Sequence, residues 1–202
     1  MGLGGVAEAT TSVPPSAAGP TTEVGDPILD VTADLLGSKG IDGLQLRDVA
    51  RGARVSLSTI YKRFPSRDDL VIAAVERWMA IHVYTPELAV HEGESMPDHL
   101  VRSFGLIFEP WRKNPTMLNA FLRAAVLPGG ERLGQQGADA VGGALADGFA
   151  DDDPELLADL DAVLPSLVAG LLARFASGEI DVDEIVRVYE RAVRRLTAGV
   201  AR

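Results

Sequence analysis

The sequence predicts an all-α fold of about nine helices, and three observations support this fold class. Apolar residues recur at helical spacing over most of the chain, whereas the alternating pattern of a strand is scarce. Helix-capping residues and prolines stand at the starts of these apolar stretches. The chain has 202 residues, 47% of them hydrophobic, so it can bury a core. We expect an N-terminal three-helix domain containing a helix-turn-helix, followed by a larger helical domain.

Composition argues against several classes of protein. The chain has no cysteine, which excludes disulfides and thiolate metal sites and fits a reducing cytoplasm. His82, His91 and His99 do not pair at the i, i+4 spacing of a two-histidine site, so we expect no metal and no cofactor. No run approaches about 18 uninterrupted apolar residues, so no membrane span is expected. Residues 1–25 lack the positive segment of a signal peptide, and we expect a disordered tail there.

Residues 26–70 are expected to form the three-helix domain. Asp26 can cap a first helix with Pro27 in its first position, and Gly40 ends that helix. A short second helix follows, because apolar residues recur at i, i+3, i+4 and i+7. These residues are Leu46, Val49, Ala50 and Ala53.

Two further helices begin at serine caps. Ser56 precedes a short third helix, and Val55 before it can pack against Ile60 as a hydrophobic staple. Ser66, with Asp69 three residues later, forms a capping box for a long fourth helix. This long helix is expected to join the two domains.

The second domain is expected over residues 71–202, with a boundary near Pro86 inside it. Asn-Pro and Asp-Pro pairs mark two of its helix starts. We expect its later helices at 98–112, 115–126, 131–150, 154–176 and 182–199.

Charge is distributed unevenly along this acidic chain, whose net charge is −10. Residues 1–46 carry one lysine against six acidic residues, and residues 68–202 carry 12 basic against 22 acidic residues. Residues 47–67, between them, carry six basic residues against Asp48 alone. Such a basic island is typical of a nucleic-acid contact, whereas DNA phosphates would repel the acidic remainder. A solvated basic face is the alternative.

The most informative stretch is LQLRDVARGARVSLSTIYKRFPSRDDL, residues 44–70. Packing of the third helix through Val55, Ile60 and Phe64 would turn its opposite face toward solvent. The order Arg-Asp-Val-Ala, Val-Ser, Thr-Ile-Tyr, Phe-Pro-Ser and an acidic pair before Leu resembles the signature of the TetR family of transcriptional regulators. That resemblance implies a repressor that binds a double-stranded DNA operator as a homodimer and is released by a small effector.

The resemblance also implies which side chains contact DNA. The recognition helix would run from Leu57 to Phe64, with Ser56 as its cap. Tyr61 and Arg67 would hold phosphates, while Leu57, Ser58, Thr59, Lys62 and Arg63 would approach base edges. The complete set of candidates is Arg47, Ser56, Leu57, Ser58, Thr59, Tyr61, Lys62, Arg63 and Arg67.

Two positions depart from the family pattern. Gln45 stands where a Ser or Thr cap is common, and Arg54 stands in the turn where the family usually has Gly. A positive φ at Arg54 would cost on the order of 1 kcal/mol, unless the turn differs. The charge of Arg54 would partly offset that cost at a phosphate.

Aromatic residues gather in the second domain, where they line an apolar effector pocket or simply form the core. The pocket candidates are Trp78, Phe104, Phe108, Trp111, Met117 and Phe121, with Arg123 as a polar end. Two segments, KNPTMLNAFLRAAV and LLARFASGEIDVDEIVRVYERAVRRL, resemble the actinobacterial regulators of steroid breakdown within the TetR family. That resemblance implies an apolar effector such as an acyl-CoA or a steroid derivative.

Apolar residues cover much of the circumference of the helix expected at 154–176. Such a helix must pack on its own domain and on something else, and a two-fold partner is the simplest candidate. A fully buried monomer core is the alternative. The interface candidates are Leu160, Val163, Leu167, Leu171, Val188, Ala192 and Leu196.

An enzyme would need a nucleophile with a base, a paired carboxylate site or a metal cluster, and the sequence predicts none of these. Asp151, Asp152 and Asp153 are adjacent, so their side chains point in different directions. The remaining alternative to a DNA-binding regulator is a helical adaptor whose basic island contacts an acidic protein.

Overall fold

The computed structural model describes residues 25–137, 149 and 153–198, and every regular element in these residues is helical. This confirms the predicted all-α class. Residues 131–137 are also helical, and the rest of the helix expected at 131–150 lies outside the described residues, as does the tail expected at 1–25 apart from Gly25. The elements are α1 (Pro27–Lys39), α2 (Leu46–Gly52), α3 (Leu57–Arg63), α4 (Arg67–His82), a 3-10 turn η1 (Pro86–Leu88), α5 (Met96–Lys113), α6 (Pro115–Ala125), α8 (Pro154–Ala176) and α9 (Val182–Leu196).

The predicted caps form at the first helices. The Asp26 carboxylate accepts hydrogen bonds from the Ile28 and Leu29 amides, and α1 ends at Gly40 with φ 70°. Ser66 and Asp69 form the expected capping box at the start of α4. Gln45 contributes no side-chain cap to α2. Local sequence therefore determines where α1 and α4 begin.

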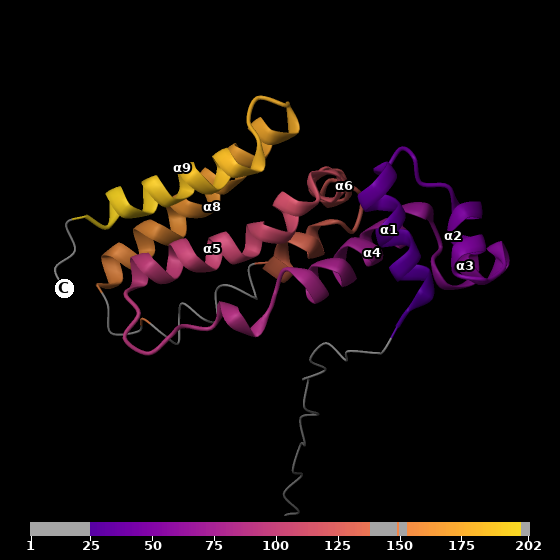
Figure 1. Ribbon diagram of the computed structural model, residues 1–202, viewed down its shortest axis with the longest axis horizontal. Coiled ribbons are helices and arrows are strands. Elements are labelled where there is room, and N and C mark those ends of the chain that lie inside the picture. Colours follow the sequence, from indigo (N-terminus) through magenta and orange to yellow (C-terminus); the bar gives the residue numbers. More distant parts are fainter. Residues whose placement is uncertain (1–24, 138–148, 150–152, 199–202) are drawn as a thin grey trace, which may run out of the picture.

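The molecule is elongated, with α1, α2 and α3 at one end and α5, α8 and α9 at the other (Figure 1). α1 packs against α2, α4 and α6, while α5 packs against α9. Buried residues from both ends belong to one continuous core. The boundary expected at residue 70 falls inside α4, which begins at Arg67.

α1 also approaches the corner between α5 and α6 closely. A Cβ atom on Gly37 would lie 2.5 Å from Asn114 Nδ2. Asn114 caps α6, because its Oδ1 accepts from the Met117 amide at 3.1 Å. Arg123 of α6 donates to the Asp42 carboxylate at 2.8 Å. The three N-terminal helices are therefore fixed to the second domain through α6 as well as through α4.

α8 differs from the other helices in its apolar character. An 18-residue window of this 23-residue helix has a mean hydropathy of 1.8, and 17% of the window is buried inside the protein. By length and composition α8 could cross a membrane, although its longest stretch without a charged side chain is the 12 residues between Asp161 and Arg174. An apolar helix with so little burial in its own subunit exposes an apolar face, which is typical of an interaction site.

Candidate functional site

α3 brings several predicted DNA-contact residues onto one exposed surface. Ile60 is 1% exposed and holds α3 against the core, together with buried Phe64. On the other side, Tyr61 is 55% exposed, and Ser58 and Lys62 are exposed as well. We call the surface formed by Ser58, Thr59, Tyr61 and Lys62 the α3 face; Leu57 at its edge is half-buried against the core.

Hydroxyl groups cluster at the start of the α3 face. The Thr59 amide donates to Ser56 Oγ at 3.1 Å, so Ser56 is the predicted cap. The Ser56 hydroxyl also lies 2.7 Å from Ser58 Oγ and 2.9 Å from Thr59 Oγ1. Ser56 therefore positions the two neighbouring hydroxyls, which remain exposed at the surface.

The basic residues of the island divide into two groups. Arg51 pairs with Asp48, and Arg63 pairs with Asp26 while its guanidinium stacks 5.3 Å from the Phe64 ring centroid. Arg67 donates to the carbonyl oxygens of Ile41 and Leu44. The island's remaining cations are exposed and make no side-chain hydrogen bond or ion pair within the described residues. These are Arg47, Arg54 and Lys62.

Two of these contacts involve residues that were predicted to contact DNA. Arg67 was expected to hold a phosphate, but its guanidinium fixes the turn between α1 and α2. Arg63 was expected near base edges, but it pairs with the carboxylate that caps α1. Sequence spacing missed both contacts because the partners lie far away along the chain.

The aromatic candidates for an effector pocket pack against one another. Phe104, Phe108, Trp111 and Met117 are buried. The Phe104 ring stacks on Phe108 at 4.4 Å and on Tyr189 of α9 at 3.6 Å between centroids. Trp111 contacts two further rings, Trp78 at 4.6 Å and Phe121 at 5.4 Å. In this conformation the cluster forms core, which was the alternative to a pocket.

Two surface hollows lie elsewhere among the described residues. One of about 210 Å³ lies between α1 and α4, where Trp78 forms part of its wall. Another of about 240 Å³ lies between α5 and α9, beside Phe108. Arg123 touches neither hollow, since it pairs with Asp42 on the surface. Its assignment as the polar end of a pocket therefore stays a prediction.

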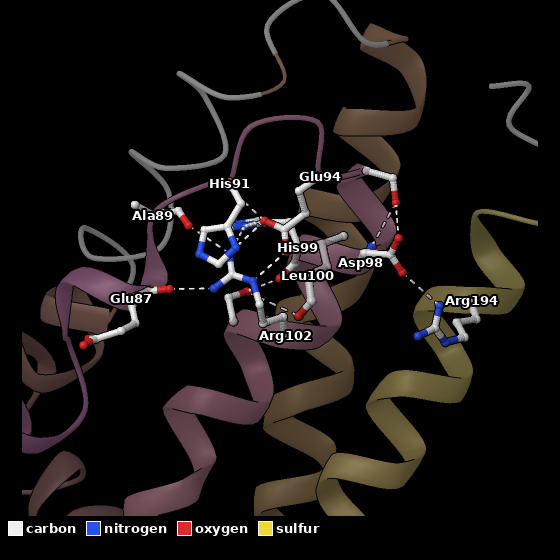
Figure 2. A network of polar contacts seen from close by, with 11 residues as sticks. Glu87, Ala89, His91, Glu94, Asp98, His99, Leu100, Arg102 and Arg194 are labelled. Atoms are coloured by element: carbon white, nitrogen blue, oxygen red, sulfur yellow. Dashed lines mark hydrogen bonds and ion pairs between the residues drawn. The ribbon is translucent and has the colours of Figure 1, made fainter.

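A polar network that the sequence did not reveal joins the start of α5 to the segment after α4 (Figure 2). Arg102 donates to both carboxylate oxygens of Glu94, at 2.6 and 2.8 Å, and to the carbonyl oxygens of Glu87 and Ala89. Buried His99 places Nδ1 3.3 Å from Glu94. The Arg102 hydrogen bonds lower the pKa of Glu94 to about 2, whereas burial lowers the pKa of His99.

The dimer candidates fall into two groups. Leu160 and Leu171 are buried within their own subunit, which corrects their assignment to an interface between subunits. Leu167, Val188 and Ala192 are half-buried, whereas Val163 and Leu196 are exposed. The outward side of α8 is lined mainly by small residues that include Ser166, Ala169, Gly170 and Ala173.

Similar proteins match both ends of the chain. The family model "Bacterial regulatory proteins, tetR family" matches residues 28–74, and "Tetracyclin repressor-like, C-terminal domain" matches residues 93–196. The HTH-type transcriptional repressor KstR of Mycolicibacterium smegmatis is 27% identical over 80% of this chain and 84% of its own length. KstR of Mycobacterium tuberculosis is 32% identical over 49% of this chain and 45% of its own length.

Solved structures show the same architecture. The multidrug-binding protein EbrR complexed with imidazole is 27% identical, with a TM-score of 0.57 over 84% of this chain and 87% of that chain. A TetR regulator from Rhodococcus sp. RHA1, 17% identical, shares the fold with a TM-score of 0.62 over 87% and 98% of the two chains. A family model spanning half of the chain, together with the helix-turn-helix match before it, shows that this chain belongs to the TetR family of transcriptional regulators and is not an enzyme.

Proposed function

We propose that the protein is a cytoplasmic homodimeric repressor that binds an operator through the α3 face and is released by a small apolar effector. The observation that carries the proposal is that the exposed hydroxyls of α3 lie with Lys62, Arg47 and Arg54, three cations without a side-chain partner among the described residues, in an otherwise acidic protein. DNA phosphates attract this surface and repel the rest of the molecule, so contact is confined to it.

The proposed roles follow from exposure and chemistry. Ser58, Thr59 and Lys62 approach base edges in the major groove, and Leu57 offers an apolar contact at the edge of the face. Tyr61 donates its hydroxyl to a phosphate, and Arg47 on the neighbouring α2 supplies a charge there. Ser56 and Arg63 hold the recognition helix in place, and Arg67 fixes the turn between α1 and α2.

The outward side of α8 is the proposed dimer contact. Small residues there permit a second copy of α8 to approach closely, and burial of this side accounts for the apolar composition of a helix that its own subunit covers so little. Exposed Val163 and Leu196 extend this surface, whereas Leu160 and Leu171 support it from within.

The effector site is proposed within the second domain, where the family's ligand-binding region matches. The packed rings of Trp78, Trp111 and Phe121 must separate to admit an effector, and Trp78 lies on α4, which leads to the three N-terminal helices. An effector that binds only the separated arrangement would shift the protein away from its DNA-binding state. The resemblance of residues 113–126 and 171–196 to the actinobacterial regulators of steroid breakdown supports an acyl-CoA or steroid derivative as that effector.

A mobility-shift titration of the full chain on the DNA upstream of its own gene tests the proposal. We expect a complex whose affinity falls steeply with salt, because phosphate contacts release counterions. Loss of the complex on addition of a steroid-derived acyl-CoA would support the effector assignment. Absence of salt-sensitive binding to any genomic fragment would instead favour an adaptor that binds only protein.

A further inference from the structure

Arg54 is the single non-glycine residue with a positive φ among the described residues, with φ 56°. The other five positive-φ positions there are all glycines, including Gly40 and Gly129. A side chain in this left-handed region is strained, because its Cβ crowds the following carbonyl oxygen. The chain therefore departs from its own pattern at this one turn.

The end of α2 fixes that conformation. The Val55 amide donates to the Ala50 carbonyl at 2.9 Å, and the Arg54 amide donates to the Arg51 carbonyl at 3.3 Å. These two hydrogen bonds define a Schellman motif, whose left-handed position is usually glycine. Val55 packs against the core directly afterwards, so Arg54 cannot relax into another conformation without disturbing the start of α3.

No contact within the described protein compensates for the strain. The Arg54 side chain is exposed, and it makes no hydrogen bond or ion pair with any described residue. Arg51, three residues earlier, pairs with Asp48 in an ordinary backbone conformation. Strained residues of this kind persist where the surrounding structure fixes them, and they cluster at functional sites.

We propose that Arg54 is a DNA-phosphate contact, held beside the recognition helix by the Schellman turn. The turn places a permanently charged guanidinium two residues before Ser56, the cap of α3. Glycine would suit the backbone better but would leave the phosphate without a partner. This inference rests on the proposed DNA-binding function and adds a contact to it.

Three variants of the full chain separate charge from strain. Arg54→Gly removes both, Arg54→Asn removes the charge while tolerating the left-handed backbone, and Arg54→Lys keeps the charge. Arg195→Gln on α9 makes the same change in net charge far from the proposed DNA-binding surface and serves as the control. Each variant is measured by fluorescence anisotropy on sheared genomic DNA and on a duplex selected by the unmodified protein, over a series of salt concentrations, and by thermal unfolding.

We expect Arg54→Gly and Arg54→Asn to fold with an unchanged or higher Tm and to bind both DNAs about 30-fold more weakly at 0.15 M salt. Their plots of log affinity against log salt should be shallower by about 2 for a dimer, one contact per subunit. Arg54→Lys should retain most of the affinity, and Arg195→Gln should behave like the unmodified protein.

Unchanged affinity and salt dependence in Arg54→Gly would overturn the inference and leave Arg54 as a strained substitute for glycine. An equal loss in Arg195→Gln would overturn it too, since the effect would then come from net charge. If Lys62→Ala weakens binding while Arg54→Gly does not, the proposed function stands and this contact fails. If the unmodified protein binds neither DNA, both fail.

Discussion

Six basic side chains lie between Arg47 and Arg67, and the contacts they make decide how each is expected to act. Three of them have partners within the domain. Arg51 pairs with Asp48, Arg63 pairs with Asp26, and Arg67 donates to the backbone of the turn after α1. The sequence correctly placed the basic island but not this division, because side-chain partners depend on the packing of distant segments. The exposed face of α3 was predictable, since it follows from helical periodicity once Ile60 is buried.

Tyr61→Phe tests the role of an exposed hydroxyl. The change removes one hydrogen bond per subunit and leaves the buried side of α3 untouched. We expect binding to weaken about 30-fold on every DNA sequence, since a phosphate contact is worth about 1 kcal/mol and a dimer loses two.

Ser58→Ala should instead alter base preference. Affinities for a panel of single-base operator variants measure both effects, and a uniform loss in Ser58→Ala would contradict its assignment to base edges.

The Glu94–Arg102 pair predicts a pH-dependent contribution to stability. The pKa of Glu94 is about 2 in the folded protein against 4.5 ordinarily, so its carboxylate stabilises the fold fully above pH 4.5 and progressively less as the pH falls toward 2. Glu94→Gln should lower the free energy of unfolding by about 2–3 kcal/mol at pH 7, and by less at pH 3.

Denaturant unfolding at the two pH values measures this difference. Glu179→Gln is the control, because its partner Arg174 is exposed and such surface pairs contribute at most about 1 kcal/mol. A Glu94→Gln deficit that stays constant between pH 7 and pH 3 would show that the ion pair is not its cause.

At the scale of helices, the starts of several elements could be predicted because caps are local. Asp26, Ser56, Ser66, Asn114 and Asp153 each accept a hydrogen bond from an amide of the helix that follows. What the helices touch was less predictable. The periodicity of α8 showed apolar residues around its circumference, but only the packed structure shows which side faces its own subunit.

Gly37 provides a test of how α1 packs against the body. Ala normally stabilises a helix interior relative to Gly by about 0.5–1 kcal/mol. Gly37→Ala should instead lower the Tm, because the added Cβ displaces the Asn114 side chain that caps α6. Gly105→Ala in α5 is the matched control, with nothing within 4 Å of its Cβ, and should raise the Tm by about 2–4 °C. Equal shifts in both variants would argue against a close α1–α6 contact.

Over the whole molecule, the acidic body and small basic surface imply that one subunit binds DNA weakly and that two are needed. Gly170→Glu tests this directly, since a Cβ at Gly170 meets nothing within its own subunit. We expect folded monomers in sedimentation and operator affinity reduced at least 100-fold. Gly170→Ala should remain dimeric, whereas a dimeric Gly170→Glu would place the interface elsewhere.

The fold class and family signature could be predicted from the sequence because they depend on periodicity, caps and one contiguous motif. The effector region could not, since Phe104, Trp111 and Tyr189 pack together from separate helices and the same rings suit a core or a pocket. The contact between Arg123 and Asp42 joins residues 81 apart in the chain, a distance over which sequence spacing carries no information.

Selection of DNA from a random-sequence duplex library by the full-length protein tests the central claim most directly. We predict enrichment of a two-fold symmetric sequence with half-sites about one helical turn or more apart, bound less tightly as salt increases. Lys62→Ala should lose that sequence or select a different one. Failure to enrich any sequence, or recovery of the same sequence at the same affinity by Lys62→Ala, would contradict recognition through the α3 face.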